Sequence, residues 1–194
     1  MNSKRNPAMR SMYIKQEFDV ELTCLHNRQI FLQQEVDEYI SLEINKQLYA
    51  LDTLNHNPIM LYIDSPGGSC SAGLSIINTM QSIESPVVTI IMGEACSMAG
   101  QISIAGTKRV CYENSVYMVH DGATEMSDYF GKIKDRAKFL EEYDKLLEKH
   151  LRKYTKLSEK EILQAKNGEL WLFADEMLAK GIVDEILISP KKVK

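Results

Sequence analysis

Apolar residues recur with two different spacings along the first half of the chain. From Val36 to Leu51 they return every three or four residues, which predicts an amphipathic helix. The polar and proline-containing stretch at residues 55–58 is expected to end that helix. Residues 59–63 and 87–92 are instead unbroken apolar runs, typical of strands in a sheet that is covered on both faces.

The same patterns predict further elements between and after these. Helices are expected at about residues 76–83, 97–105 and 175–180, and strands at residues 29–32, 108–112, 116–120 and 182–188. Strands therefore alternate with helices through most of the chain. This order predicts an α/β fold with a parallel-rich sheet and right-handed crossover connections.

A long charged helix is expected late in the chain, at residues 132–154. Its apolar positions fall on one face: Ile133, Ala137, Leu140, Tyr143, Leu147, Leu151 and Tyr154. Ser158 followed by Glu161 is a capping-box pattern, so a shorter helix is expected to begin there.

Composition narrows the class of protein. The chain has 194 residues, enough for one domain with a substantial core, and a net charge of −4 without a basic block, which argues against a nucleic-acid partner. No apolar run reaches the roughly 20 residues of a membrane span, and residues 1–18 lack the apolar core of a secretory signal. The four cysteines form no Cys-x-x-Cys pair, so we expect no metal site, reduced thiols and a cytoplasmic location.

Two glycine- or serine-containing turns are the first candidates for chemistry. Gly67-Gly68 and Cys96-Ser97-Met98 each follow a buried strand and precede a helix. The first N–H groups of a helix lack intrahelical partners, so two such turns placed side by side could bind a developing oxyanion. Ser97, in the stretch GEACSMAG, could be a nucleophile there, or it could only cap the helix that follows.

A serine nucleophile needs a base, and the chain has four histidines. His56 lies in a polar loop and is expected to be exposed. His150 is expected on the solvated face of the long helix, and His26 lies ahead of the sheet. His120 ends an apolar strand, so it can stand at the carboxyl edge of the sheet beside both turns. The plainer alternative is a histidine whose ring is bonded only to backbone groups.

These residues carry the pattern of a known family. The stretch LYIDSPGGSCSAGLSIINTMQSIESPVVTIIMGEACSMAG resembles the proteolytic subunit of the Clp protease, which has a crotonase-type fold with a serine protease site. RQIFL, NSVYMVHDG and ADEMLAKGIVDEI resemble other parts of that family. The resemblance covers roughly residues 28–186 and is densest at residues 61–120.

The resemblance implies a role for each candidate residue. Ser97 would be the nucleophile, His120 the general base, and the N–H groups of Gly68 and Met98 the oxyanion hole. Glu169 stands where the family has its aspartate; Asp121 is the alternative acid. No metal or cofactor is implied.

The resemblance also implies an organisation. Residues 28–188 would form a single peptidase domain with a protruding "handle" helix at about residues 132–155, between an N-terminal segment at residues 1–27, expected to be flexible, and a tail at residues 189–194. The protein would assemble with itself into a ring, a heptamer or a double heptamer, and hydrolyse unfolded polypeptides. An AAA+ unfoldase is the implied partner, although residues 1–27 do not resemble the family's propeptide and axial loop. The residues after His120 also depart from the family, with Asp121-Gly122 in place of Gln-Pro and residues 123–128 in place of a Gly-rich strand.

Three other functions remain open on the sequence. A crotonase-type acyl-CoA enzyme would use the same paired N–H groups, but it has no need of a serine matched to a histidine. A catalytically silent subunit could build a mixed ring, and a phage-type processing or head-maturation protease could share the fold.

Overall fold

The computed structural model describes residues 19–122 and 126–188. The helices of these ranges are α2 (Val20–His26), α3 (Glu38–Leu54), α4 (Cys70–Ser82), α5 (Met98–Ser103), α6 (Phe130–Tyr154), α7 (Glu159–Asn167) and α8 (Ala174–Ala179). The strands are β1 (Gln29–Leu32), β2 (Ile59–Ser65), β3 (Val87–Cys96), β4 (Lys108–Tyr112), β5 (Val116–His120), β6 (Glu169–Phe173) and β7 (Glu185–Leu187).

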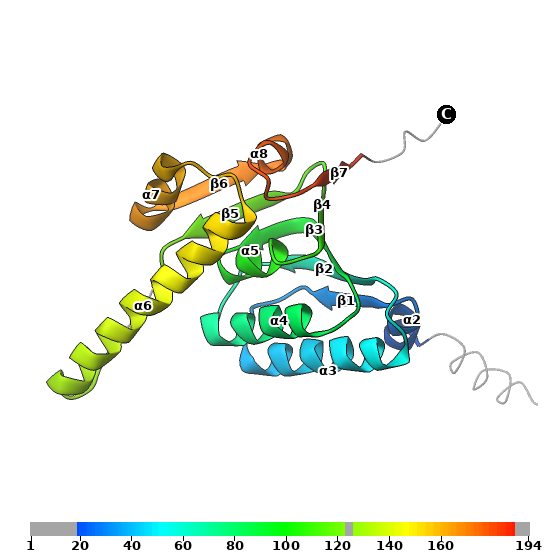
Figure 1. Cartoon of the computed structure of the whole chain (residues 1–194), viewed down its shortest axis with the longest axis horizontal. Helices are drawn as coiled ribbons and strands as arrows, with labels where there is room; N and C mark the ends of the chain where they lie inside the picture. The colour runs from blue at the N-terminus through cyan, green and yellow to red at the C-terminus, as the bar shows by residue number, and fades with distance from the viewer. Residues whose placement is uncertain (1–18, 123–125, 189–194) are drawn as a thin grey trace, which may run out of the picture.

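The strands form one mixed but mostly parallel sheet. Its main path runs β1-β2-β3-β4-β7, and every pair along it is parallel. β5 pairs in parallel with the end of β3, and β6 adds to β5 in the antiparallel sense. The predicted α/β class with a parallel-rich sheet is therefore confirmed (Figure 1).

β3 is longer than its apolar run predicts. Its first half pairs with β4, and its last three residues, Glu94 to Cys96, pair with β5. The expected strand end at Met92 is wrong because β5 supplies new backbone partners just beyond it. The Ser115 hydroxyl, which precedes β5, also donates to the Ile91 carbonyl of β3 at 2.8 Å. The strand consequently ends at Cys96, immediately before Ser97. The third helix is shorter than expected: α5 ends at Ser103.

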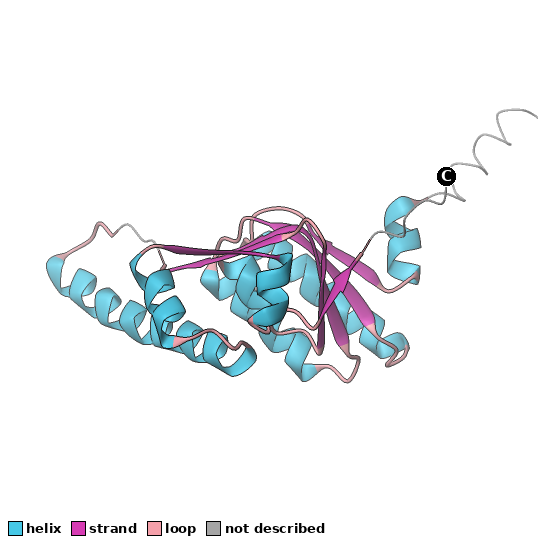
Figure 2. Cartoon of the chain, turned by 90° about the horizontal axis from the view of Figure 1, so that it is seen from above, coloured by secondary structure: helices cyan, strands magenta, loops and turns pink. Residues whose placement is uncertain are grey.

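The helices α3 and α4 pack together beside the sheet, and both views show them on the same side of it (Figures 1 and 2). Ile44, Leu48 and Leu51 of α3 are buried, as the spacing predicts. Ser41 on this face is also buried, and its hydroxyl donates to the Ala72 carbonyl of α4 at 2.9 Å. Burying these aliphatic side chains fixes α3 against α4 and β1, at the side of the sheet where α4 follows the Gly67-Gly68 turn.

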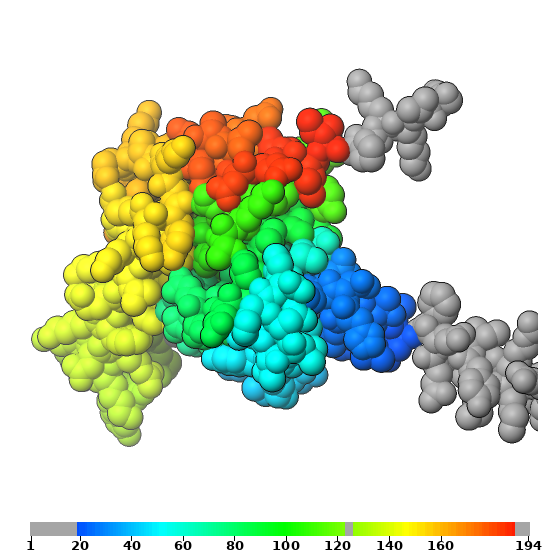
Figure 3. Space-filling model, turned by 45° about the vertical axis from the view of Figure 1, so that its right-hand side comes forward, coloured from blue at the N-terminus to red at the C-terminus, as the bar shows by residue number. Residues whose placement is uncertain are grey.

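The helix α6 confirms the long charged helix expected from the sequence, beginning at Phe130. Each apolar residue predicted for its inner face is buried or half-buried, but among its described residues only Leu151 is fully buried. Its first half stands clear of the body, as the ribbon and the space-filling view both show (Figures 1 and 3). Phe139 in this half and Leu146 farther along the helix are exposed. A helix in this position presents apolar surface that the single chain does not cover.

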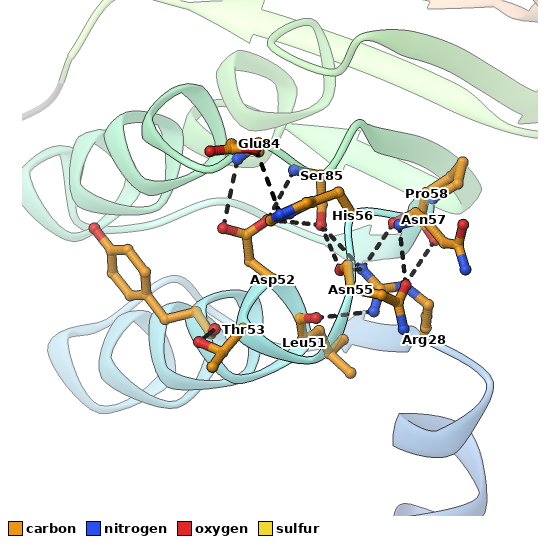
Figure 4. Close-up of polar contacts among 11 residues, drawn as sticks. Arg28, Leu51, Asp52, Thr53, Asn55, His56, Asn57, Pro58, Glu84 and Ser85 are labelled. Atoms are coloured by element: carbon orange, nitrogen blue, oxygen red, sulfur yellow. Dashed lines mark hydrogen bonds and ion pairs between the residues drawn. The ribbon is translucent and has the colours of Figure 1, made fainter.

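The chain enters the sheet through Arg28, which has a left-handed backbone (φ 58°). Its guanidinium donates to the carbonyls of Leu51, Asn55, Asn57 and Pro58 and to the Ser85 hydroxyl at 2.7–3.2 Å (Figure 4). Five donors arranged in a planar fork suit such a cluster of acceptors. Arg28 therefore joins the start of β1 to the turns that precede β2 and β3.

Two elements were not expected from the sequence. Val20–His26 forms α2, inside the segment predicted to be flexible, and Asp19 caps it by accepting from the Leu22 N–H at 3.1 Å. Glu169–Phe173 forms β6. The other residues of the expected N-terminal segment, 1–18, and the expected tail, 189–194, lie outside the described residues.

Candidate active site

The turn at Gly67-Gly68 depends on its two glycines. Their φ angles are 95° and 144°, in the region that disfavours side chains. A Cβ on Gly67 would lie 2.6 Å from the Cys96 carbonyl oxygen and 2.8 Å from the Ser97 Cβ. The two turns singled out in the sequence are thus in contact, and only a residue without a side chain permits that approach.

Gly68 is held on its other side by Val36. The Val36 N–H donates to the Gly67 carbonyl and the Ser69 N–H donates to the Val36 carbonyl, both at 2.7 Å. In this parallel bridge, Val36 bonds to Gly67 and to Ser69. Gly68 lies between these two residues, and in such a bridge the middle residue directs its own N–H and C=O away from the partner strand. The Gly68 N–H consequently points away from Val36, toward the β3 side of β2.

Ser97 has a strained backbone at the junction of β3 and α5. Its φ is 53° and its ψ is −120°, a conformation that costs a non-glycine residue about 1–3 kcal/mol. Its N–H donates to the Met118 carbonyl at 2.8 Å, which ties the turn to β5. The Ser97 hydroxyl makes no capping hydrogen bond to α5. The helix-cap alternative raised by the sequence is therefore wrong for this serine.

Ser97 and His120 line the same cavity. Met98 lines it too, and the remaining walls come from α4, α5, α6, α7 and the end of β5. His120 is half-buried at the carboxyl end of β5, where the topology brings it beside the Ser97 turn. The three positions expected to act together, Ser97, Met98 and His120, are thus within one site.

Glu169 lies on the strand next to His120. In the antiparallel pairing of β5 with β6, His120 is directly opposite Glu169. Directly opposed residues project to the same face of a sheet, with Cβ atoms roughly 5 Å apart. The Glu169 carboxylate accepts a hydrogen bond from the Trp171 indole N–H at 2.8 Å. The carboxylate is exposed, and its bonded partner here is the indole rather than the imidazole.

Asp121, the alternative acid, is turned toward its own loop. Its N–H donates to the Ala165 carbonyl at 3.0 Å, and its carboxylate accepts from the Gly122 N–H at 2.8 Å. Part of the segment expected to replace the family's Gly-rich strand, residues 123–125, lies outside the described residues.

The prediction for His150 is wrong. The residue is half-buried between α6 and α5, and its Nδ1 lies 2.8 Å from the Gln101 Oε1. Burial lowers the pKa of His150 to about 4, with a smaller contribution from Lys153, so the ring is neutral at pH 7. The sequence did not indicate this because its partner lies 49 residues away, on another helix. His56 is exposed as expected, beside Asp52 and Glu84.

The cysteine next to Ser97 is not a competing nucleophile. Burial, and then Glu94, raise the pKa of the Cys96 thiol to about 12. A thiol with so high a pKa carries almost no thiolate at neutral pH, and the thiolate is the reactive form. Cys111 is buried in the same way, and all four cysteines are free.

Two kinds of feature are missing from the residues that the structure describes. None of their helices combines the length and apolarity needed to cross a membrane. Within residues 19–122 and 126–188, no three His, Cys, Asp or Glu side chains gather closely enough to hold a metal ion.

A serine held in a strained strand-to-helix turn, with its hydroxyl unused by the helix, is the arrangement that α/β serine hydrolases give their nucleophile. Comparison with known proteins agrees with that class. The model of the Clp protease family matches residues 14–190. The ATP-dependent Clp protease proteolytic subunits of Streptococcus pyogenes serotypes M5 (strain Manfredo) and M49 (strain NZ131) are each 34% identical over 182 residues. The alignment spans 89% of this chain and 91% of each relative. The chain belongs to the Clp protease family and is a serine-type peptidase.

Proposed function

We propose that this protein is an endopeptidase that hydrolyses unfolded polypeptides through Ser97, His120 and Glu169. The observation that carries the proposal is the Ser97 turn. The backbone there is held at φ 53°, although its hydroxyl contributes no cap to α5, and the cavity beside it contains His120. Strain of this kind is retained where the rest of the fold enforces it, commonly at catalytic residues.

The reaction begins with proton transfer from the Ser97 hydroxyl to His120. The Ser97 Oγ attacks the peptide carbonyl carbon, and His120 then protonates the leaving amine as the C–N bond breaks. Water, deprotonated by the same imidazole, attacks the acyl-enzyme ester and releases the second product and free Ser97. Each cycle consumes one water and restores every proton to its starting position.

The N–H groups of Gly68 and Met98 stabilise the oxyanion in both steps. Met98 is the first residue of α5, so its N–H has no acceptor within that helix. The Gly68 N–H is directed away from Val36, toward the side where the Ser97 turn contacts Gly67. Losing one such donor costs an enzyme about 3–4 kcal/mol of transition-state stabilisation.

Glu169 acts as the acid that orients the imidazole. Its position opposite His120 in the strand pairing supports this role. A rotation of the Glu169 side chain would exchange its bond to Trp171 for one to His120, and the longer side chain of glutamate gives that freedom.

The protein acts as a ring of identical subunits, a heptamer or a double heptamer, in the cytoplasm. Tyr39 and Tyr49 of α3 and Phe139 and Leu146 of α6 are exposed on the single chain. Apolar surface of this extent is characteristic of protein interfaces. The Streptococcus pyogenes relatives are named ATP-dependent, and we propose an AAA+ unfoldase as the corresponding partner of this chain.

Two measurements on the full-length protein test this proposal. Native mass spectrometry should give a seven- or fourteen-subunit species, and a stable monomer would contradict the ring. The assembled protein should release fluorescent peptides from a labelled, permanently unfolded protein, and Ser97→Ala should abolish the release. Equal release by Ser97→Ala would contradict the proposed chemistry.

A further inference from the structure

The cavity beside Ser97 has mainly apolar walls and one buried carboxamide. Cys70, Leu147, Leu151 and Ile162 contribute apolar surface from three helices. Gln101 lines the same cavity although it is only 6% exposed. It lies on α5, four residues after Ser97, and its N–H donates to the Ser97 carbonyl at 3.2 Å; both residues line this cavity.

His150 fixes the orientation of the Gln101 side chain. The Gln101 Oε1 accepts from the His150 Nδ1 at 2.8 Å, and the ring is neutral because of its burial. The ring is held in turn by Tyr154, at a centroid distance of 4.6 Å. With Oε1 engaged by His150, the amide N–H₂ of Gln101 is the end of the side chain that remains for a ligand.

The buried pair of Gln101 and His150 lowers the stability of the folded protein. Burying a polar group without complete hydrogen bonding costs about 1–3 kcal/mol, and the His150 Nε2 is buried without a partner among the described residues. Two apolar side chains would fill the same space without that cost. Incompletely bonded buried polar groups are therefore most readily explained by a functional role.

Three charged groups of the cavity, Lys166, Asp144 and Glu148, are engaged with one another, and the Asp121 carboxylate accepts from the Gly122 N–H. Lys166 lies 3.2 Å from Asp144 and 2.7 Å from Glu148. These contacts leave the carboxamide of Gln101 as a neutral polar group, beside the Ser97 hydroxyl, among the apolar walls.

We propose that Gln101 is a specificity-determining residue that selects the substrate side chain beside the scissile bond, favouring a long side chain with an apolar stem and a neutral hydrogen-bond acceptor at its end. Glutamine has this chemistry, and methionine is its apolar counterpart of similar shape. The inference rests on the proposed function, because it requires a peptide bound at Ser97. A pocket built to hydrogen-bond a substrate group discriminates against analogues that lack it, whereas an apolar pocket separates them weakly.

The test compares two fluorogenic peptides that differ only in the residue on the acyl side of the cleaved bond, glutamine or methionine. The quantity measured is the ratio of kcat/KM for the two peptides. Gln101→Met should lower the glutamine-to-methionine ratio about tenfold, the value of one neutral hydrogen bond, while retaining cleavage of the methionine peptide. The matched control is Gln33→Met, an exposed glutamine outside the cavity, which should leave the ratio unchanged.

Gln101→Met leaves the His150 ring without its partner and could impair folding. The double variant Gln101→Met/His150→Phe removes both polar groups and should restore the thermal unfolding midpoint while keeping the lowered ratio. A purely structural role for the pair would change the unfolding midpoint but leave the ratio within about twofold of wild type, and that result overturns the inference.

The two proposals fail in different ways. If wild-type protein is modified at Ser97 by an active-site probe and cleaves both peptides, but the ratio does not respond to Gln101, only the specificity inference is wrong. If wild-type protein cleaves neither peptide and takes up no probe, the proposed function is wrong and the inference falls with it.

Discussion

Two serines begin neighbouring helices in this protein, and they use their hydroxyl groups differently. Ser69 precedes α4 with an ordinary φ of −57°, and its hydroxyl accepts a hydrogen bond from the Ala72 N–H. Ser97 precedes α5 with a φ of 53°, and its hydroxyl makes no capping bond. Both follow parallel strands whose ends lie side by side. Each stands between a strand and a helix, and the backbone shows why only Ser69 acts as a cap.

The difference shows how the fold divides structural and chemical roles. A serine that caps a helix contributes about 1 kcal/mol to stability and needs no strain. The strain at Ser97 is maintained by its surroundings, since Gly67 packs against it and the Met118 carbonyl accepts its N–H. Ser97 is thus held by its neighbours while its hydroxyl remains available for reaction.

The largest expected effect is that of Ser97→Ala. Removing the hydroxyl should lower kcat for peptide hydrolysis by at least about 10³-fold, because the covalent step is lost. The thermal unfolding midpoint should remain close to that of wild type, since no hydrogen bond to α5 is removed. Steady-state kinetics and a thermal melt of the same preparation check both outcomes. A variant that keeps more than a tenth of the activity would contradict the role of Ser97.

The next effect concerns the acid. Glu169→Gln should lower kcat about 10²-fold or more with little change in KM, because a neutral amide no longer stabilises the imidazolium. Trp171→Phe removes the indole N–H that bonds Glu169 and keeps a smaller aromatic ring at this exposed position, so it should leave kcat unchanged or slightly raised. If Glu169→Gln has wild-type kinetics, Glu169 is not the acid.

Gly67→Ala tests the contact between the two turns. The new Cβ would meet the Cys96 carbonyl oxygen at 2.6 Å, and the φ of 95° is itself unfavourable for alanine. We expect a loss of stability of more than about 1 kcal/mol and at least a tenfold loss of activity, measured by denaturant unfolding and peptide hydrolysis.

Gly131→Ala is the matched control, because a Cβ there meets nothing within 4 Å and the residue lies in α6. It should leave activity unchanged and stabilise the helix by up to about 1 kcal/mol. Equal behaviour of the two alanine variants would show that the contact of Gly67 with the Ser97 turn is unimportant.

The smallest effect should come from Ser69→Ala. Loss of the cap should lower the free energy of unfolding by about 1 kcal/mol and leave kcat within about twofold of wild type. Urea unfolding and peptide hydrolysis of Ser69→Ala and Ser97→Ala compare what each serine contributes to stability and to kcat. A kcat loss for Ser69→Ala comparable to that for Ser97→Ala would remove the distinction between them.

Much of the fold could be predicted from local patterns. The spacing of Ile44, Leu48 and Leu51 indicates α3, and the apolar runs indicate β2 and β3. β6 could not be recognised in this way. Its outward positions carry Trp171 and Phe173, both exposed on this chain, so the alternation of polar and apolar residues that marks a half-buried strand is absent.

Some features of the candidate site could likewise be predicted from the sequence, and others could not. The contact of the Gly67 and Ser97 turns follows from two strand ends in a parallel sheet, and the sequence is sufficient to expect it. The bond between His150 and Gln101 depends on how α6 crosses α5, which no spacing within either helix encodes. For Glu169 the prediction was partial. The sequence aligns Glu169 with the family's aspartate, but it does not indicate the bond to Trp171.

The most direct test of the central claim is labelling of the assembled wild-type protein with a fluorophosphonate probe, followed by mass spectrometry of the modified peptide. We expect a single adduct on Ser97, none on Ser69, and no labelling of Ser97→Ala. Absence of an adduct on Ser97 in the assembled wild-type protein, or equal labelling of Ser69, would contradict that claim.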